Sequence, residues 1–187
     1  RLTSASDIPD IDPDLIIVMD MGAWSQLETL ADWLRERRDC VIGLDHHASG
    51  DDVAPVRYID PASASCSMIV LELLDVLEIP LNTSVAEALF SGLATDTGWF
   101  RQANADAAAF GAAARLLDQG VDKAGLYRVI EETARPARLR LHARALSSIQ
   151  WHADGQVAIM QLSRSDFEET DGKRSDVTGL VNAPLVV

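Results

Sequence analysis

The stretch VIGLDHHASG, residues 41–50, decides the fold because an apolar run ends there in an acid and two of the chain's four histidines. The run CVIGL at 40–44 is apolar and rich in β-forming residues, which predicts a buried strand. LIIVMD at 15–20 is a second run of this kind and also ends in an acid. Between the two runs, residues 24–38 carry apolar side chains at helical spacing, namely Leu27, Leu30, Ala31 and Leu34. A strand, a short helical crossover and a strand predict a parallel pair in an α/β sheet.

The rest of the chain is expected to be mostly helical. Apolar periodicity predicts helices at 62–78, at 83–100 with an end near Thr95, at 105–120, at 122–132 and at 136–150. VAIMQL at 157–162 predicts a strand that opens a different region. We therefore expect three parts: a parallel α/β domain over 1–132, a linker helix region over 133–152, and part of a smaller α/β domain over 153–187. This last part, roughly 35 residues, is too short to fold alone.

Composition limits the classes of function. The chain has 187 residues, 48% of them hydrophobic and 24% charged, with a net charge of −13. Such an acidic chain is not expected to bind duplex nucleic acid through its surface, although bound cations and a few arginines can attract a small phosphate ester. We find no run apolar enough to span a bilayer and no secretory leader, so a cytoplasmic protein without membrane association is expected. Cys40 and Cys66 lie in apolar contexts and fit reduced core residues.

Acids and histidines follow both predicted strands. Asp20 ends the first strand, and Asp45, His46 and His47 end the second. Because ligands of parallel α/β sheets bind at the carboxyl ends of the strands, we expect these side chains to converge. Carboxylates with imidazoles suit Mn²⁺ or a similar divalent ion, since no cysteine competes to make the site zinc-like. Two structural alternatives stay open: Asp20 as a turn former, and two solvated histidines.

A third candidate acid lies in SGLATDTGWF, residues 91–100. Asp96 follows an apolar helix, where the negative end of the helix dipole disfavours a carboxylate. An acid at such a place needs a compensating cation, and a metal ion could supply it.

These segments, in this order, resemble the motifs of the DHH phosphoesterase superfamily. LIIVMDMG, VIGLDHHAS and LFSGLATDTGWFR carry the resemblance, and YIDPASASCSMIVLELL is similar to the segment that follows the Asp-His-His triplet. The likeness covers most of residues 10–130 and implies a DHH domain there. Residues 153–187 resemble the beginning of the DHH-associated C-terminal domain, and GLVN within them leans towards the nanoRNase and pAp-phosphatase (RecJ-like) group.

The resemblance implies a role for each matching residue. Asp20 would be a carboxylate shared by two metal ions, and His46 and Asp96 would be further metal ligands. His47 would be a catalytic residue that faces the substrate phosphate, and Asp45 would orient its neighbours. Arg101, just after the third motif, is a candidate phosphate contact, with an exposed charge as the alternative.

The resemblance also implies an activity. We expect a phosphoesterase that uses two Mn²⁺ ions, with Mg²⁺ as the alternative, to activate water against short oligonucleotides or the 3′,5′-bisphosphonucleotide pAp. A cyclic-dinucleotide phosphodiesterase and a single-strand exonuclease of the same superfamily stay open, as does a homodimer.

Two family motifs are missing from this sequence. The first motif, a His and paired acids on an N-terminal strand, is absent, and so is the glycine- and histidine-rich motif late in the C-terminal domain. The two gaps lead us to expect a chain shortened at both ends, and a first residue Arg1 rather than Met agrees with this at the N-terminal end. The missing first motif keeps open a non-catalytic regulator that binds nucleotide or metal.

Overall fold

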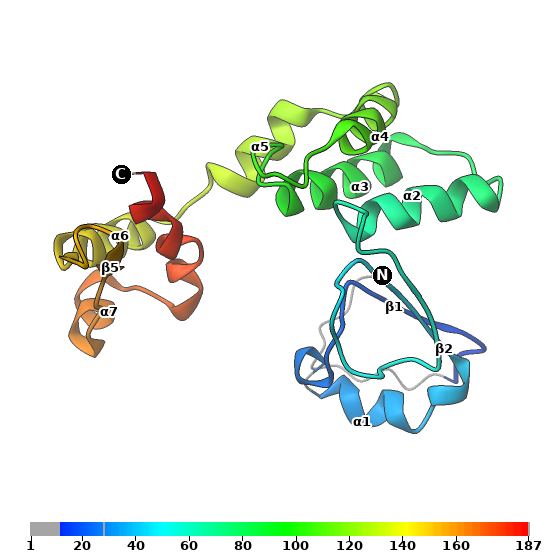
Figure 1. The fold of residues 1–187 in the computed structure, drawn as a ribbon, viewed down its shortest axis with the longest axis horizontal. Coiled ribbons are helices and arrows are strands. Elements are labelled where there is room, and N and C mark those ends of the chain that lie inside the picture. Colours follow the sequence, from blue (N-terminus) through cyan, green and yellow to red (C-terminus); the bar gives the residue numbers. More distant parts are fainter. Residues whose placement is uncertain (1–11, 28, 187) are drawn as a thin grey trace. The chain divides into compact units, whose positions relative to one another are not determined.

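The computed structural model describes residues 12–27 and 29–186 and divides the chain into two compact units, Arg1–Leu126 and Tyr127–Val187. The first unit contains a three-stranded parallel sheet of β1 (Ile16–Met19), β2 (Val41–Asp45) and β3 (Val56–Ile59). The strand order is β1-β2-β3, and Ile16 pairs with Val41. The predicted parallel α/β sheet is therefore confirmed (Figure 1).

The segment between β1 and β2 differs from the predicted single helix. It consists of a 3₁₀ turn at Trp24–Gln26, helix α1 at Leu30–Arg35 and a second 3₁₀ turn at Arg38–Cys40. The first turn has its own N-terminal partners, because Gln26 accepts from the backbone N–H of Ala23 and Asp51 accepts from that of Trp24. The apolar spacing was nevertheless informative, because Leu27, Ala31 and Leu34 are buried against β1 and β2.

Four helices follow the sheet: α2 (Cys66–Val76), α3 (Thr83–Asp96), α4 (Ala107–Leu117) and α5 (Lys123–Glu131). The side chain of Asn82 accepts from Val85 N and caps α3, and that of Asp106 accepts from Ala109 N and caps α4. Helices α2, α3 and α4 share one apolar core, whose fully buried members include Phe90, Leu93 and Leu116.

Helix α2 also covers part of the sheet. Leu44 of β2 packs against Cys66 and Ile69, and this small cluster joins the sheet to the helical layer. The contact fixes the carboxyl end of β2, where the Asp-His-His triplet begins, relative to the helices.

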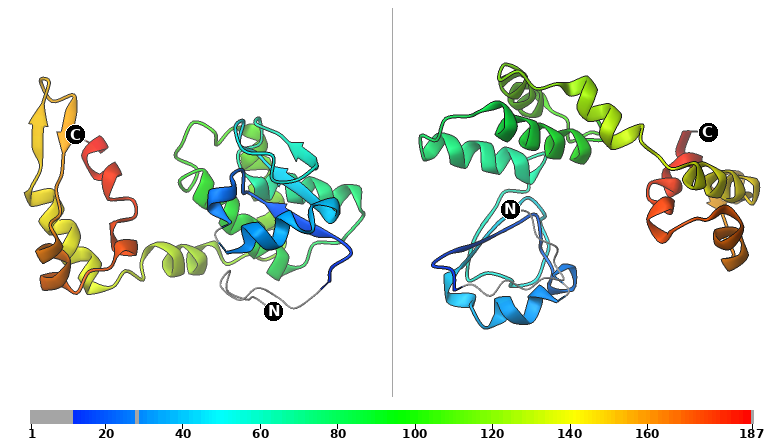
Figure 2. Two further views of the ribbon diagram at one scale, coloured as in Figure 1. Left: turned by 90° about the horizontal axis from the view of Figure 1, so that it is seen from below. Right: turned by 180° about the vertical axis from the view of Figure 1, so that it is seen from behind.

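The second unit contains α6 (Pro136–Ser147), β4 (Gln150–His152), β5 (Val157–Ile159) and α7 (Arg164–Thr170), followed by 3₁₀ turns at Arg174–Val177 and Leu180–Val186. Strands β4 and β5 form an antiparallel hairpin (Figure 2, orange). Pro136 begins α6, as its fixed φ favours. Arg144 of α6 forms an ion pair with Glu169 of α7, and Arg135 does so with Asp171.

Two strands were missing from the sequence prediction, β3 and β4. Both are short, and every residue in them is exposed. Runs of four and three residues are too short for a two-residue period to stand out, and pairing with a neighbour decides their conformation. The predicted division at 1–132, 133–152 and 153–187 stays a prediction about domains. Within the described residues, we find no helix that is long and apolar enough to cross a membrane.

Candidate metal centre

Asp20 lies immediately after β1. Its backbone N–H donates to the carbonyl of Leu44 at 3.0 Å, which extends the pairing of the two strands by one residue. Its φ of +59° is in the left-handed region, where Asp is one of the non-glycine residues found most often. This turn ends the strand and leaves the carboxylate half-exposed at the carboxyl edge of the sheet.

Asp45 organises the loop that follows β2. One carboxylate oxygen, Oδ1, accepts from the backbone N–H groups of His46 at 2.7 Å and His47 at 3.0 Å. The same oxygen accepts from the ring Nδ1 of His47 at 2.7 Å. Burial alone would raise the pKa of Asp45, but hydrogen bonds from His47 and His46 outweigh burial and lower that pKa.

His46 turns one ring nitrogen towards two carboxylates. Its Nδ1 lies 3.2 Å from the backbone carbonyl of Ser63, and a proton on Nδ1 makes this a hydrogen bond. That tautomer leaves the lone pair on Nε2, which lies 3.4 Å from Oδ1 of Asp20 and 3.8 Å from Oδ2 of Asp96. A backbone carbonyl on the other nitrogen is the usual way in which proteins orient a metal-binding histidine.

Asp96 is the last residue of α3. The following Thr97 is fully buried, and residues 98–100 all have positive φ, so the chain leaves the helix in a left-handed turn. The hydroxyl of Thr97 accepts from Phe100 N at 3.1 Å and stabilises that turn. Burial and then the charge of Asp20 raise the pKa of Asp96, against the lowering effect of the two histidines. A bound cation would relieve this repulsion.

His47 is half-exposed beside the same carboxylates. Its hydrogen bond to Asp45 is the main reason that its pKa is raised, and the charges of Asp20 and Asp96 add to this effect. The ring Nδ1 lies 3.6 Å from Oδ1 of Asp20 as well. A histidine that keeps its proton beside this edge can donate it to a phosphate oxygen.

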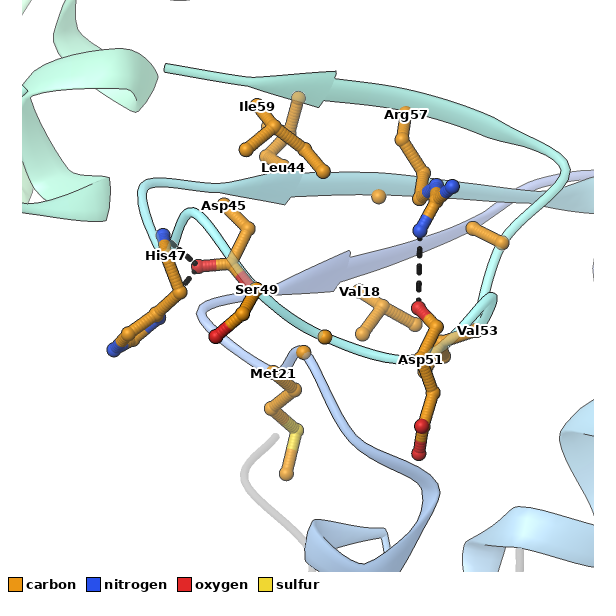
Figure 3. A pocket seen from close by; sticks show the side chains of 14 residues that line it. Val18, Met21, Leu44, Asp45, His47, Ser49, Asp51, Val53, Arg57 and Ile59 are labelled. Carbon is orange, nitrogen blue, oxygen red and sulfur yellow. Dashed lines mark hydrogen bonds and ion pairs between the residues drawn. The ribbon is translucent and has the colours of Figure 1, made fainter. Parts of the chain in front are cut away.

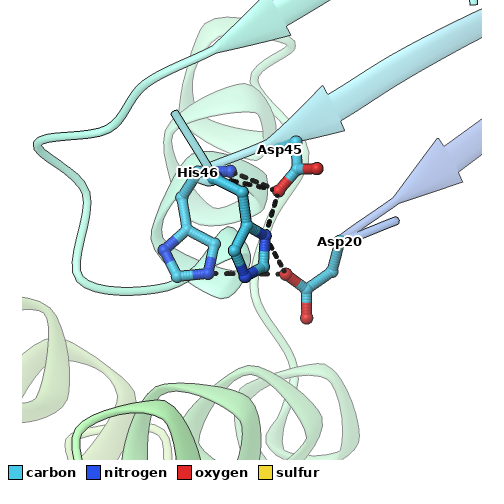
Figure 4. A group of neighbouring side chains, drawn as sticks. Asp20, Asp45 and His46 are labelled. Carbon is cyan, nitrogen blue, oxygen red and sulfur yellow. Dashed lines mark hydrogen bonds and ion pairs between the residues drawn. The ribbon is translucent and has the colours of Figure 1, made fainter. Parts of the chain in front are cut away.

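Four of the predicted residues therefore form one cluster, in which ligand atoms of Asp20, Asp45, His46 and His47 all lie within 4.8 Å of one another. Asp96 joins it through His46. Figure 4 shows Asp20, Asp45 and His46 pointing towards each other from the ends of neighbouring strands.

Arg101 is exposed, and its Nε donates to the carbonyl of Gly98 at 2.9 Å. Within the described residues, Arg101 makes no hydrogen bond or ion pair with the cluster, so its phosphate-binding role stays a prediction. Sequence reasoning missed Ser63, which acts through its carbonyl and therefore leaves no side-chain signal. It also missed Asn104, whose amide donates to the carbonyls of Ala64 and Asp96, both at 3.1 Å.

The donor atoms fit a divalent cation that prefers oxygen and imidazole. Two ligands held at about 2.1 Å from one ion and at right angles lie roughly 3.0 Å apart, so the 3.4 Å between Asp20 and His46 leaves room for one between them. Cys66 is buried close to the carboxylates of the cluster, and its thiol donates to the carbonyl of Leu44 at 3.4 Å. Burial raises the pKa of the Cys66 thiol to about 11, and its sulfur is not among the ligand atoms that gather within 4.8 Å of one another.

Comparison with known proteins identifies the class of this fold and site. Residues 3–93 match the DHH family, N-terminal domain. A bifunctional oligoribonuclease and PAP phosphatase NrnA of Thermus thermophilus is 30% identical over 141 residues, which are 75% of this chain and 43% of that protein. A probable protein of the same name from Streptococcus mutans is 24% identical over 94% of this chain and 57% of its own length. The chain therefore spans about half the length of these curated relatives.

Two further relatives agree with this class. A cyclic-di-AMP phosphodiesterase GdpP of Geobacillus thermodenitrificans is 31% identical over 64% of this chain and 18% of that protein. The crystal structure of an exopolyphosphatase-related protein from Bacteroides fragilis matches with a TM-score of 0.86 and 27% identity, over 93% of this chain and 52% of that one. The matched segment and these relatives support a DHH superfamily phosphoesterase near the NrnA-type proteins, as the motifs of the chain predicted.

Proposed function

We propose that this chain carries the active site of a metal-dependent phosphoesterase that hydrolyses short oligonucleotides or a 3′,5′-bisphosphonucleotide. One observation carries the proposal: the carboxylates of Asp20, just after β1, and Asp96, at the end of α3, both approach Nε2 of His46. The relatives named as oligoribonuclease and PAP phosphatase support this class of substrate. The net charge of −13 favours a short substrate over a duplex.

In this proposal Asp20, His46 and Asp96 hold the metal, with two Mn²⁺ ions preferred and Mg²⁺ as the alternative. When bound, such ions supply positive charge that attracts the phosphate and lowers the pKa of a nearby water. Neutral His46 limits the negative charge of the ligand set, so that an anionic substrate can still approach.

His47 and Asp45 would act as a pair. Because Nδ1 of His47 is held by Asp45, its Nε2 is the nitrogen available to the substrate. A protonated ring can hydrogen-bond a phosphate oxygen or pass its proton to the leaving group, and the Asp45 carboxylate stabilises that protonated form. Arg101 is proposed as a further phosphate contact. Residues 1–132 would then be the catalytic DHH domain, and 153–187 would begin the DHH-associated domain.

A cyclic dinucleotide is the second candidate substrate. The 31% identity to the cyclic-di-AMP phosphodiesterase supports it, because that protein is also named for cleaving a phosphodiester between nucleotides.

The test is a hydrolysis panel with the full-length protein: a dinucleotide, pAp, a cyclic dinucleotide and pyrophosphate, each with Mn²⁺ and with a chelator at fixed salt. We expect Mn²⁺-dependent release of nucleoside monophosphate. Asp96→Asn should abolish it. Asp118→Asn is the matched control, because Asp118 is an acid at the C-terminal end of α4, as Asp96 is at that of α3, but its side chain is exposed.

Three results would count against the proposal. Turnover that persists in the chelator would show that hydrolysis does not need the metal. Equal rates for Asp96→Asn and the control would show that Asp96 is not needed for hydrolysis. Cleavage of pyrophosphate alone would contradict the nucleotide substrate.

A further inference from the structure

Two loops, with the strand ends that lead into them, carry four residues of the candidate metal centre, Asp20, Asp45, His46 and His47, and the loops contact each other beside it. The first follows β1 and contains Asp20 and Gly22, and the second follows β2 and contains His47 and Gly50. The backbone N–H of Asp51 donates to the carbonyl of Gly22 at 2.5 Å. The Asp51 carboxylate also accepts from the backbone N–H of Trp24 at 2.9 Å.

Figure 3 shows how close these loops run. The chain leaves Asp45, passes Ser49 and reaches Asp51, where it lies beside the segment that carries Met21. Residues of both loops and of all three strands line a small cavity of about 30 Å³, which has room for about one water molecule. The two loops and the strands beside them therefore leave little empty space between them.

Gly50 has a specific steric reason to be glycine. A Cβ on Gly50 would lie 2.5 Å from the carbonyl oxygen of Gly22 and 3.1 Å from its Cα. The obstacle is backbone, which cannot turn aside as a side chain can. Gly50 does not have a positive φ, so conformational freedom does not explain why a glycine is needed here. The close approach of the Gly22 backbone explains it.

Gly22 is under a milder form of the same constraint. A Cβ there would lie 3.2 Å from Oδ2 of Asp45 and 3.4 Å from the carbonyl of Ser49. These distances demand a shift of a few tenths of an ångström rather than a separation of the loops. An added Cβ would therefore disturb the same contact at either glycine, strongly at Gly50 and mildly at Gly22.

Separation of the loops would act on the metal ligands. The β1–β2 ladder holds the backbone only as far as Asp20, whose N–H bonds Leu44 O. Beyond that point the Gly22–Gly50 contact joins the Asp20 loop to the His47 loop. Gly22 is two residues from Asp20, and Gly50 is three residues from His47. A shift at this contact would therefore change the 3.4 Å and 3.6 Å spacings of Asp20 to the two histidines.

We propose that Gly22 and Gly50 are positioning residues, which lock the two strand-end loops so that the Asp20 carboxylate meets the Asp-His-His triplet at a spacing that binds a divalent cation. This inference rests on the proposed metal-dependent function. It predicts that a methyl group added at this contact reduces the magnitude of the free energy of Mn²⁺ binding by more than it lowers the free energy of unfolding.

The experiment measures Mn²⁺ affinity by calorimetry for the full-length protein, together with the melting temperature in chelator. The variants are Gly50→Ala, Gly22→Ala and the control Gly111→Ala, where an added Cβ meets nothing within 4 Å. We expect Gly50→Ala to lose at least about tenfold in affinity, the loss that outer partners of metal ligands commonly cause. Gly22→Ala should lose less, and the control should bind as the wild type does.

The readouts separate this proposal from the one on which it rests. Wild-type protein that binds no Mn²⁺ would overturn the metal-dependent function and this inference with it. Wild-type binding with an unchanged affinity in Gly50→Ala would overturn the inference alone. A lower melting temperature in chelator without loss of affinity would also overturn it, because the contact would then serve only the fold. If Gly50→Ala does not fold, Gly22→Ala decides, and an affinity equal to that of the control overturns the inference.

Discussion

Replacement of Asp45 should cost stability even when no metal is bound, because its carboxylate organises the loop after β2. Oδ1 accepts three hydrogen bonds, two from backbone N–H groups and one from His47. Each backbone bond to a charged acceptor contributes roughly 1.5 kcal/mol. The His47 ring is half-exposed, so its bond is screened and contributes about 0.5 kcal/mol. Asp45→Ala should therefore lower the free energy of unfolding by about 3.5 kcal/mol.

Asp45→Asn is the matched variant. The asparagine oxygen can still accept all three bonds, but without the charge, and charge-assisted hydrogen bonds are roughly twice as strong as neutral ones. We expect Asp45→Asn to lose about half as much stability as Asp45→Ala. The assay is urea unfolding in chelator near pH 6, with the urea dependence of the free energy compared between variants.

The pH dependence gives a second check with a definite sign. The pKa of His47 is raised above 6.5 by its bond to Asp45, so this bond stabilises the fold fully below that value. The stabilisation is lost as pH rises through the raised pKa of His47. The gap between wild type and Asp45→Asn should therefore narrow at alkaline pH. Both variants unfolding within 0.5 kcal/mol of wild type, or a gap that widens with rising pH, would refute the reasoning.

Two other substitutions and one alkylation reaction test neighbouring parts of the site. His47→Gln should lower hydrolysis by roughly 10²–10⁴-fold but change Mn²⁺ affinity much less, because His47 is proposed to donate a proton; a parallel loss of both would make it a metal ligand. Asn104→Leu should weaken Mn²⁺ binding severalfold in calorimetry, since its amide joins the carbonyls of Ala64 and Asp96; wild-type affinity would exclude that role. Cys66 should resist alkylation at pH 8 until the protein unfolds, because burial raises its pKa to about 11; rapid modification seen by mass spectrometry would contradict its burial.

The sequence was sufficient for the parallel pair of β1 and β2 and for the ends of these two strands. Both β1 and β2 are apolar runs that stop at an acid, and a short crossover leaves little choice of topology. It was also sufficient to choose Asp20, His46 and Asp96 as groups to examine together. The places of Asp20 and His46 at the ends of two strands predicted a shared edge, and the resemblance to the DHH motifs added Asp96 to the set.

What the sequence could not supply depends on backbone contacts and on pairing. Ser63 acts through its carbonyl, and any residue type offers the same group. Gly50 is needed because another backbone passes close to it, and a glycine in a polar turn does not reveal that neighbour. The four residues of β3 are all exposed, so only pairing with β2 makes them a strand. Helix α1 is shorter than the apolar spacing predicted, and a separate 3₁₀ turn precedes it, whose first N–H groups bond to Gln26 and Asp51.

The most direct test of the central claim is anomalous diffraction from crystals of the full-length protein soaked in Mn²⁺. Our account predicts a manganese peak within bonding distance of Nε2 of His46 and of carboxylate oxygens from both Asp20 and Asp96. Manganese bound elsewhere, or a peak that touches His46 without either carboxylate, would contradict it.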